Sequence, residues 1–152
     1  RTFKPTEDLL YFLLECLAKS PYHIRTGNHI ERRVGMINFS IVGRNASLIE
    51  RKHYFSTDRL SREREKIAAQ INENFEGISA SVGGKISIDI YPTGWDKSQV
   101  LKNIPEGNYF FFGDQAQPGG NDYFLAKVLT DNGHTVYNVS GHKETWKILK
   151  LK

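Results

Sequence analysis

The sequence contains a single cysteine, Cys16, and no hydrophobic run of membrane-spanning length. One cysteine excludes a disulfide framework within the chain, and we expect a reducing compartment and therefore a cytoplasmic location. The longest apolar stretch, residues 9–17, is interrupted by Glu15 and is shorter than the roughly 18–20 residues that cross a bilayer. The five histidines lack the spacing of zinc ligands. These absences argue against a disulfide-stapled domain, a membrane protein and a zinc enzyme.

Several motifs of nucleotide-binding and hydrolytic enzymes are also missing. There is no Gly-rich Walker loop, no Gly-x-Gly-x-x-Gly fingerprint and no Gly-x-Ser-x-Gly nucleophile elbow. The chain has 21 basic and 17 acidic side chains, a formal net charge of +4, which permits an anionic partner. Its basic residues are not interleaved with aromatic ones as in RNA-binding motifs. We expect no nucleic-acid partner and no membrane partner.

The first part of the sequence shows helical and strand periodicities in turn. Leucines at helical spacing predict a helix over residues 7–19. The other expected elements are strands over 28–34, 36–42, 77–82 and 85–91, a short helix that begins at the Ser47–Glu50 capping box, and a helix over 58–75. The repeated order helix, strand, strand predicts an α+β layer, namely one four-stranded antiparallel sheet with helices on its apolar face. The opposite, polar face would be available for a ligand.

The helix expected over 58–75 has an apolar and a charged side. Leu60 and Ile67 lie on its expected core side. The alternating charges of residues 62–65 are typical of a solvated, ion-paired surface, so we expect Arg64 to be exposed. The same expectation applies to Arg32, Arg59 and Arg62.

From Pro92 onward, single helices and strands alternate. The expected elements are a helix near 96–104, a strand over 109–112, a helix near 120–131, a strand over 134–139 and a terminal helix over 142–151. Such alternation predicts parallel α/β units. Because two parallel strands do not form a stable, doubly covered sheet alone, we expect further strands upstream of Arg1. The prediction is a cap domain over 1–91 and, over 92–152, the C-terminal part of a Rossmann-like α/β core.

Three arginines occur near the ends of elements expected at one edge of the first sheet. Arg33 ends a strand, Arg44 follows the next strand, and Arg51 is one turn into the capped helix. Arginine forks bind phosphate bidentately, so the three together predict a phosphate clamp. Ser87 and Asp89, on the polar sheet face, could bind sugar hydroxyls. The alternative for each arginine, including Arg51, is an exposed and solvated charge.

A second group of candidates lies in the α/β part. Asp114 follows a buried strand, where open α/β sheets bind ligands, and its carboxylate suits Mg²⁺. Residues 119–122 then begin a helix, which would turn backbone N–H groups, Asn121 and Asp122 toward the same crevice. Lys97 begins another helix, where its ammonium could neutralise a phosphoryl group. The alternatives are a turn in which the two aspartates only cap a helix, and an ordinary surface lysine.

Six short motifs between about residue 26 and the C-terminus carry a family resemblance. They are Arg33-Val-Gly-Met-Ile-Asn-x-Ser, Ile-Val-Gly-Arg44, Glu50-Arg51, Gly84-Lys-Ile-Ser87-Ile-Asp89, Gly94-Trp-Asp-Lys97, and Phe112-Gly-Asp114 continued by Pro118-Gly-Gly-Asn-Asp122. On these motifs the sequence resembles the eukaryotic-type phosphomannomutases of the haloacid dehalogenase superfamily. The resemblance implies a cap followed by the C-terminal part of the catalytic core.

The resemblance also implies roles for the candidate residues. That family moves phosphate between O1 and O6 of mannose with an Asp-x-Asp nucleophile pair and Mg²⁺. By resemblance, Arg33, Arg44 and Arg51 bind the distal phosphate, and Ser87 and Asp89 bind the sugar. Lys97 binds the transferring phosphoryl group, and Asp114 binds the Mg²⁺. The candidate catalytic residues are Lys97, Asn121 and Asp122.

Two departures from the family pattern keep alternatives open. The Asp-x-Asp pair does not occur in these 152 residues, so we expect it upstream. Residues 123–131 lack the pattern of the family's second metal loop and are more similar to related sugar phosphatases.

The leading prediction is a phosphohexomutase that interconverts mannose 1-phosphate and mannose 6-phosphate through an aspartyl-phosphate. The alternatives are a Mg²⁺-dependent sugar phosphatase and, for a complete chain, a non-catalytic phosphosugar-binding module. A homodimer through the cap is a further expectation.

Overall fold

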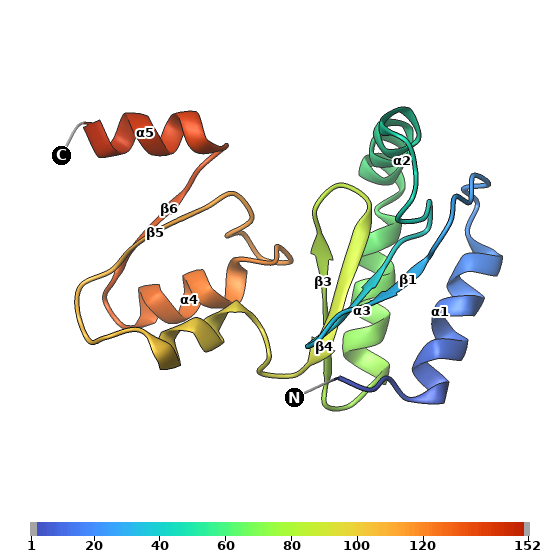
Figure 1. Cartoon of the computed structure of the whole chain (residues 1–152), viewed down its shortest axis with the longest axis horizontal. Helices are drawn as coiled ribbons and strands as arrows, with labels where there is room; N and C mark the ends of the chain where they lie inside the picture. Colours follow the sequence, from blue (N-terminus) through green and yellow to red (C-terminus); the bar gives the residue numbers. More distant parts are fainter. Residues whose placement is uncertain (1–2, 151–152) are drawn as a thin grey trace. The chain divides into compact units, whose positions relative to one another are not determined.

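The computed structural model describes residues 3–150, which form two compact units with their boundary between Thr93 and Gly94 (Figure 1). The first unit contains α1 (Glu7–Lys19), β1 (Ile30–Arg32), β2 (Ile37–Phe39), α2 (Leu48–Ser61), α3 (Glu63–Asn74), β3 (Ile78–Gly83) and β4 (Ser87–Pro92). The second contains the 3₁₀ helix η1 (Lys97–Asn103), β5 (Phe110–Gly113), α4 (Tyr123–Asp131), β6 (Thr135–Asn138) and α5 (His142–Lys150).

The first unit is built on one antiparallel sheet in the strand order β1-β2-β4-β3, with helices beside it (Figure 1). Alternate residues of a strand share a face, so the pairing of Ile37 with Ile90 and of Phe39 with Ile88 gathers apolar side chains on one face. The same buried core includes Leu9 and Leu13 of α1 and Ile67 and Ile71 of α3. The predicted α+β layer is confirmed.

The continuous helix predicted over 58–75 is wrong, because the chain breaks at Arg62 between α2 and α3. Arg62 has a φ of 54°, in the left-handed region that residues with a Cβ adopt uncommonly. The break changes the helical phase, so Leu60 is 89% exposed while Ile67 is buried. The helix that begins at the Ser47–Glu50 capping box, which we expected to be short, is α2 and continues to Ser61.

The second unit contains a parallel pair of strands, β5 and β6, against which α4 packs. The predicted parallel α/β arrangement is confirmed. The helix expected near 96–104 is the 3₁₀ helix η1, none of whose residues is fully buried. The helix expected near 120–131 begins only at Tyr123. Before it, Gly119 has a φ of 87° and the Gly120 N–H donates to the Gln117 carbonyl at 2.9 Å, which makes a turn.

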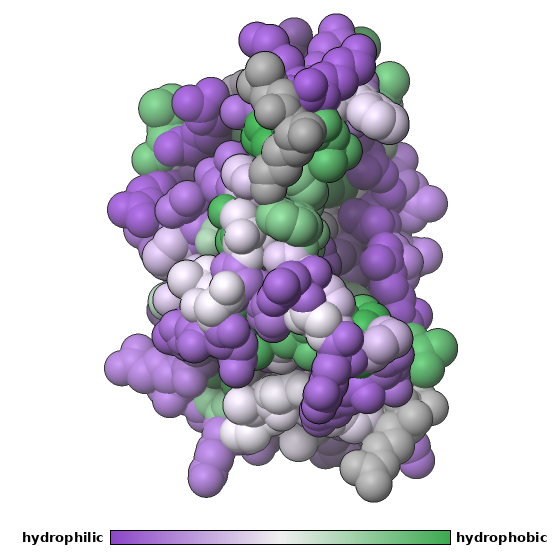
Figure 2. Space-filling view, turned by 90° about the vertical axis from the view of Figure 1, so that its left-hand side faces the viewer, coloured by the Kyte–Doolittle hydropathy of each residue, from purple (hydrophilic) through white to green (hydrophobic). Residues whose placement is uncertain are grey.

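Hydrophobic side chains remain exposed on both units. Figure 2 shows one face of the molecule, on which hydrophobic groups are interspersed with hydrophilic ones. In the second unit, the large exposed hydrophobic residues include Phe110, Phe124, Trp146 and Leu149. Within residues 3–150, no helix combines the length and the apolar character that crossing a membrane requires.

The core assignment predicts opposite outcomes for two leucine-to-alanine changes. Leu13 is fully buried and Leu60 is exposed. We expect Leu13→Ala to lower the free energy of unfolding by about 2–5 kcal/mol, because it removes buried methyl groups and leaves a cavity. Leu60→Ala should change it little. Chemical denaturation of both variants checks this, and a large loss in Leu60→Ala would contradict the helix break.

Candidate functional site

A groove of about 860 Å³ in the first unit brings together five residues that the sequence predicted as a ligand site. They are Arg33, Arg44, Arg51, Ser87 and Asp89. One part of the lining belongs to α2 and another to the turn between β3 and β4, next to which α2 lies in Figure 1. The groove therefore combines guanidinium groups with a polar strand surface.

Strand register places a row of polar residues across the sheet. Glu31 pairs with Asn38, Asn38 with Asp89, and Asp89 with Ser81, on β1, β2, β4 and β3 in that order. The Asn38 Nδ2 donates to Asp89 Oδ1 at 2.6 Å, which fixes the carboxylate. A Cβ on Gly83 would lie 2.6 Å from Asp89 Oδ2, so the carboxylate occupies space that only glycine leaves. Asp89 is thus held in place from two strands.

Glu31 organises two of the three arginines, and sequence reasoning missed it. Its carboxylate accepts from Arg44 Nε at 2.7 Å and from Arg33 Nε at 3.0 Å. These bonds, first the one from Arg44 and then the one from Arg33, lower the pKa of the Glu31 carboxyl below its ordinary value. The two guanidinium groups are thereby held side by side. The spacing of Glu31 and Arg33, two residues apart at the end of a strand, could have indicated their pairing, whereas the pair with Arg44, 13 residues away, has no local signal.

Arg51 is only partly exposed, which corrects the alternative of a freely solvated charge. Its Nε donates to the Ala46 carbonyl at 2.8 Å, and its Nη2 donates to the Arg44 carbonyl. Arg51 therefore holds the loop that carries Arg44. It has a structural role as well as a position in the groove lining.

Three further cations line the groove, and the sequence analysis did not assign them there. Lys52 and Arg59 lie on α2, and Lys85 lies in the turn between β3 and β4. Lys52, Phe55 and Arg59 are three and four residues apart, so they share one face of the helix. That spacing is the signal that could have placed Lys52 and Arg59 beside Arg51. Arg59 is exposed, as expected, but its surface belongs to the groove.

Arg64 departs furthest from its sequence expectation. It was predicted to be a solvated surface charge, and it is 4% exposed. Its Nε donates to Asp58 Oδ2 at 2.8 Å within a buried ion pair. Helical spacing was the signal that could have placed it, because Arg64 is three residues before Ile67 and seven before Ile71, on the same buried face of α3.

In the second unit the structure joins Lys97 to Asp122. The Lys97 ammonium pairs with Asp122 Oδ1, and the other carboxylate oxygen accepts the Gln115 N–H at 3.3 Å. A Cβ on Gly113 would lie 3.0 Å from Asp122 Oδ2, so this glycine leaves room for the carboxylate. Lys97 remains half exposed, while Asp122 is buried. The Lys97 ammonium is therefore held by a buried carboxylate, while half of the lysine side chain remains exposed to solvent.

Asp114 and Asn121 lie near this pair along the chain. Asp114 directly follows β5 and is exposed, and Asn121 is half-buried. Residues 3–150 contain no group of three or more acidic, histidine or cysteine side chains that could hold a metal ion. Asp114 can offer one carboxylate ligand to a cation, outside any such group of three.

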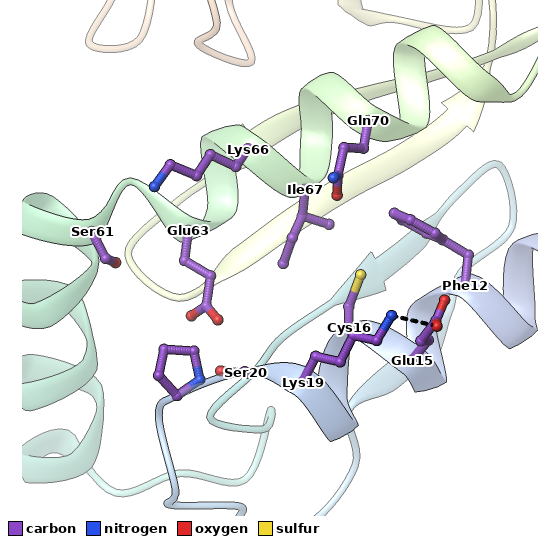
Figure 3. Close-up of a pocket in the computed structure, with 11 residues that line it drawn as sticks. Phe12, Glu15, Cys16, Lys19, Ser20, Ser61, Glu63, Lys66, Ile67 and Gln70 are labelled. Atoms are coloured by element: carbon purple, nitrogen blue, oxygen red, sulfur yellow. Dashed lines mark hydrogen bonds and ion pairs between the residues drawn. The ribbon is translucent and has the colours of Figure 1, made fainter.

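A second cavity of about 450 Å³ lies between α1 and the α2–α3 segment (Figure 3). None of the predicted site residues lines it. Figure 3 shows Cys16 on α1 and Glu63 and Ile67 on α3 pointing into the space between the helices. Burial, assisted by the charges of Glu15 and Glu63, raises the pKa of the Cys16 thiol to about 11. The thiol is thus protonated at neutral pH and is a poor nucleophile.

Comparison with known proteins assigns the family. The family model described as eukaryotic phosphomannomutase matches residues 4–151. The chain belongs to this family. A phosphomannomutase of Encephalitozoon cuniculi is 44% identical over 132 residues, which are 84% of this chain and 52% of that protein. A probable phosphomannomutase of Caenorhabditis elegans is 37% identical over 134 residues, 86% of this chain and 53% of its own length. The chain thus spans about half the length of the curated relatives it matches.

Solved structures match the chain as well. One of them is an N-terminally truncated, IMP-bound IMP-nucleotidase of Plasmodium falciparum, aligned over 98% of this chain and 39% of its own, with a TM-score of 0.49 and 20% identity. A likeness of that degree supports no argument about this chain. The family assignment confirms the resemblance found in the sequence, whereas the roles of single residues stay predictions.

The Glu31 contacts predict a pH-dependent contribution to stability. Because the pKa of Glu31 is lowered in the folded chain, its ion pairs stabilise the fold above the ordinary pKa of 4.5. That contribution falls as the pH drops from 4.5 through the lowered value. We expect wild type to be more stable than Glu31→Gln at neutral pH, with the difference vanishing in acid. Urea unfolding across this range measures it; a difference that persists below the lowered pKa would exclude the ion pairs as the cause.

Proposed function

We propose that the groove of the first unit binds a hexose phosphate, and that the whole protein interconverts mannose 1-phosphate and mannose 6-phosphate. The observation that carries the proposal is the gathering of Arg33, Arg44, Arg51, Ser87 and Asp89 in one groove. Membership of the eukaryotic phosphomannomutase family supports the choice of mannose phosphate. The groove thus acts as the substrate-binding surface of a cap.

Each side chain of the groove has a chemistry suited to one part of that ligand. Guanidinium groups donate paired hydrogen bonds to phosphate oxygens. Because Glu31 already holds Arg33 and Arg44, little conformational entropy is lost when they meet a phosphate. Asp89, fixed by Asn38, accepts hydrogen bonds from sugar hydroxyls. The Ser87 hydroxyl donates to the Gly83 carbonyl at 2.9 Å, which leaves its oxygen as an acceptor.

The second unit would act on the phosphoryl group that is transferred. Lys97, held by Asp122, places a positive charge where it can offset the charge of phosphoryl oxygens. The half-buried Asn121 amide could donate a hydrogen bond beside it. Asp114 would give Mg²⁺ one carboxylate oxygen, and the bound ion would neutralise further phosphoryl charge. Asn121 and Asp122, with Lys97, are the proposed catalytic residues of this chain.

We also propose a cytoplasmic protein that pairs through its cap. The single free thiol supports a reducing compartment. On α1, Tyr11 and Leu14 are large exposed hydrophobic residues, which a second cap could cover. Size measurement of the protein at several concentrations tests the pairing.

Product analysis distinguishes the mutase from a phosphatase. We expect the full-length protein, given mannose 1-phosphate and a hexose bisphosphate activator, to form mannose 6-phosphate. Release of free phosphate without mannose 6-phosphate would instead indicate a sugar phosphatase. Binding of mannose 1-phosphate with neither product, in the full-length protein, would indicate a non-catalytic phosphosugar-binding module.

Two matched arginine changes test the phosphate clamp. Arg33 pairs with Glu31 in the groove, and Arg62 pairs with Glu65 at an exposed position that is not part of the groove lining. We expect Arg33→Gln to weaken mannose 1-phosphate binding by about 1.5–3 kcal/mol, the worth of a hydrogen bond to a charged group. Arg62→Gln should leave it unchanged. Both variants should melt close to wild type, since exposed ion pairs contribute little. Calorimetric titration measures the affinities, and equal losses in both variants would argue for long-range charge alone.

A further inference from the structure

A buried ion pair joins the two helices on either side of the left-handed residue Arg62. Asp58, near the end of α2, and Arg64, in the first turn of α3, are 6% and 4% exposed. Asp58 Oδ2 accepts from Arg64 Nε at 2.8 Å, and Asp58 Oδ1 accepts the Arg64 backbone N–H at 2.9 Å. The carboxylate thus caps the start of α3, where Arg62 gives no side-chain cap of its own.

The remaining donors of Arg64 reach the strand turn that lines the groove. Its Nη1 lies 3.1 Å from the Gly84 carbonyl oxygen and 3.3 Å from those of Gly83 and Ser87. Gly83, Gly84 and Ser87 all belong to the groove lining. Because these acceptors are backbone atoms, Arg64 fixes the path of the turn itself.

Both parts of the groove lining are therefore connected through one buried pair. Asp58 belongs to α2, which supplies Arg51, Lys52 and Arg59, and Arg64 holds the turn that leads to Ser87 and Asp89. A change in this pair would shift the turn relative to α2. Neither Asp58 nor Arg64 lines the groove itself.

We propose that Asp58 and Arg64 are a positioning pair, which sets the distance between α2 and the β3–β4 turn and so the affinity of the groove for the sugar part of its ligand. This inference rests on the proposed function, because it takes a phosphorylated sugar as the ligand. Phosphate alone would contact chiefly Arg33, Arg44 and Arg51. These are held by Glu31 and by backbone carbonyls outside the turn, while the turn contributes only one cation, the exposed Lys85. The pair therefore affects sugar recognition and leaves phosphate binding unchanged.

Stability alone does not require such a pair. Replacing a buried ion pair with apolar side chains is often neutral or stabilising, whereas removing one partner leaves a buried charge and is strongly destabilising. An apolar pair could not donate to the three carbonyls of the turn. A double variant that keeps the fold but removes the guanidinium therefore separates positioning from folding.

The test uses the full-length protein with the double change Asp58→Asn and Arg64→Met. The introduced asparagine would still accept the backbone N–H at the start of α3, while the introduced methionine would fill the space of the arginine stem. We expect a melting temperature near wild type, unchanged affinity for inorganic phosphate, and affinity for mannose 1-phosphate about tenfold lower, equivalent to one lost charge-assisted hydrogen bond. Hydrogen exchange at the amides of residues 83–87 should become faster. Arg62→Met, a matched change at an exposed arginine, should alter none of these.

Other results of these measurements would overturn either the positioning role or the proposed function. A folded double variant that binds mannose 1-phosphate as wild type does would overturn the positioning role. If the double variant does not fold, Arg64→Lys, which keeps the charge but loses the fork, should weaken sugar-phosphate binding without affecting phosphate, and equal loss for both ligands would overturn the proposal. Failure of wild type to bind mannose 1-phosphate would refute the proposed function instead. In that case unchanged exchange at 83–87 would separately refute the link from Arg64 to the turn.

Discussion

The register between β2 and β4 is the constraint on which both the core and the groove depend. It pairs Ile37 with Ile90 and Phe39 with Ile88 on the apolar face, and in the same ladder it pairs Asn38 with Asp89 on the polar face. Because side chains alternate with a period of two, a shift by one residue would bury the polar row and expose the apolar one. The hydrophobic core therefore selects the register, and the register places Asp89 beside its hydrogen-bond donor. Folding stability and ligand geometry cannot vary independently at these positions.

The cations of the groove present a different physical problem, since like charges gathered on one surface repel. This repulsion is reduced because the guanidinium groups are hydrogen-bonded to a carboxylate and to backbone carbonyls. Glu31 compensates Arg33 and Arg44, and the guanidinium of Arg51 donates to backbone carbonyls. The lysines at positions 52 and 85 are exposed, where solvent screens their charge. An anionic ligand would thus meet a surface that is held in shape before it arrives, which lowers the entropic cost of binding.

Sequence periodicity predicted the strands and most helices because the core enforces it, as in the alternation of Ile86, Ile88 and Ile90. It failed at Arg62, where a non-glycine residue adopts a left-handed conformation without a local signal. The break at Arg62 leaves Leu60 exposed, whereas Arg64 is buried because it shares the inner face of α3 with Ile67 and Ile71. Arg33 and Arg44 follow antiparallel strands at opposite ends of the β1–β2 pair, and their long side chains meet at Glu31 between them. The role of Glu31 in joining two arginines was missed because Arg44 is 13 residues away, although Arg33 is only two residues from it.

The break at Arg62 has an energetic cost that something else in the fold must offset. A residue with a Cβ in a left-handed conformation is strained by about 1–3 kcal/mol. Asp58 offsets that strain locally, because one of its side-chain oxygens accepts the Arg64 backbone N–H and so caps the start of α3. The sharp break in turn lets α2 lie along the groove while α3 packs its own apolar residues against the sheet. Arg64 shares the buried face of α3 with Ile67 and Ile71, and from there it is the common donor to the carbonyls of the β3–β4 turn. Arg62 is thus part of the arrangement that places α2 and the β3–β4 turn along the same groove.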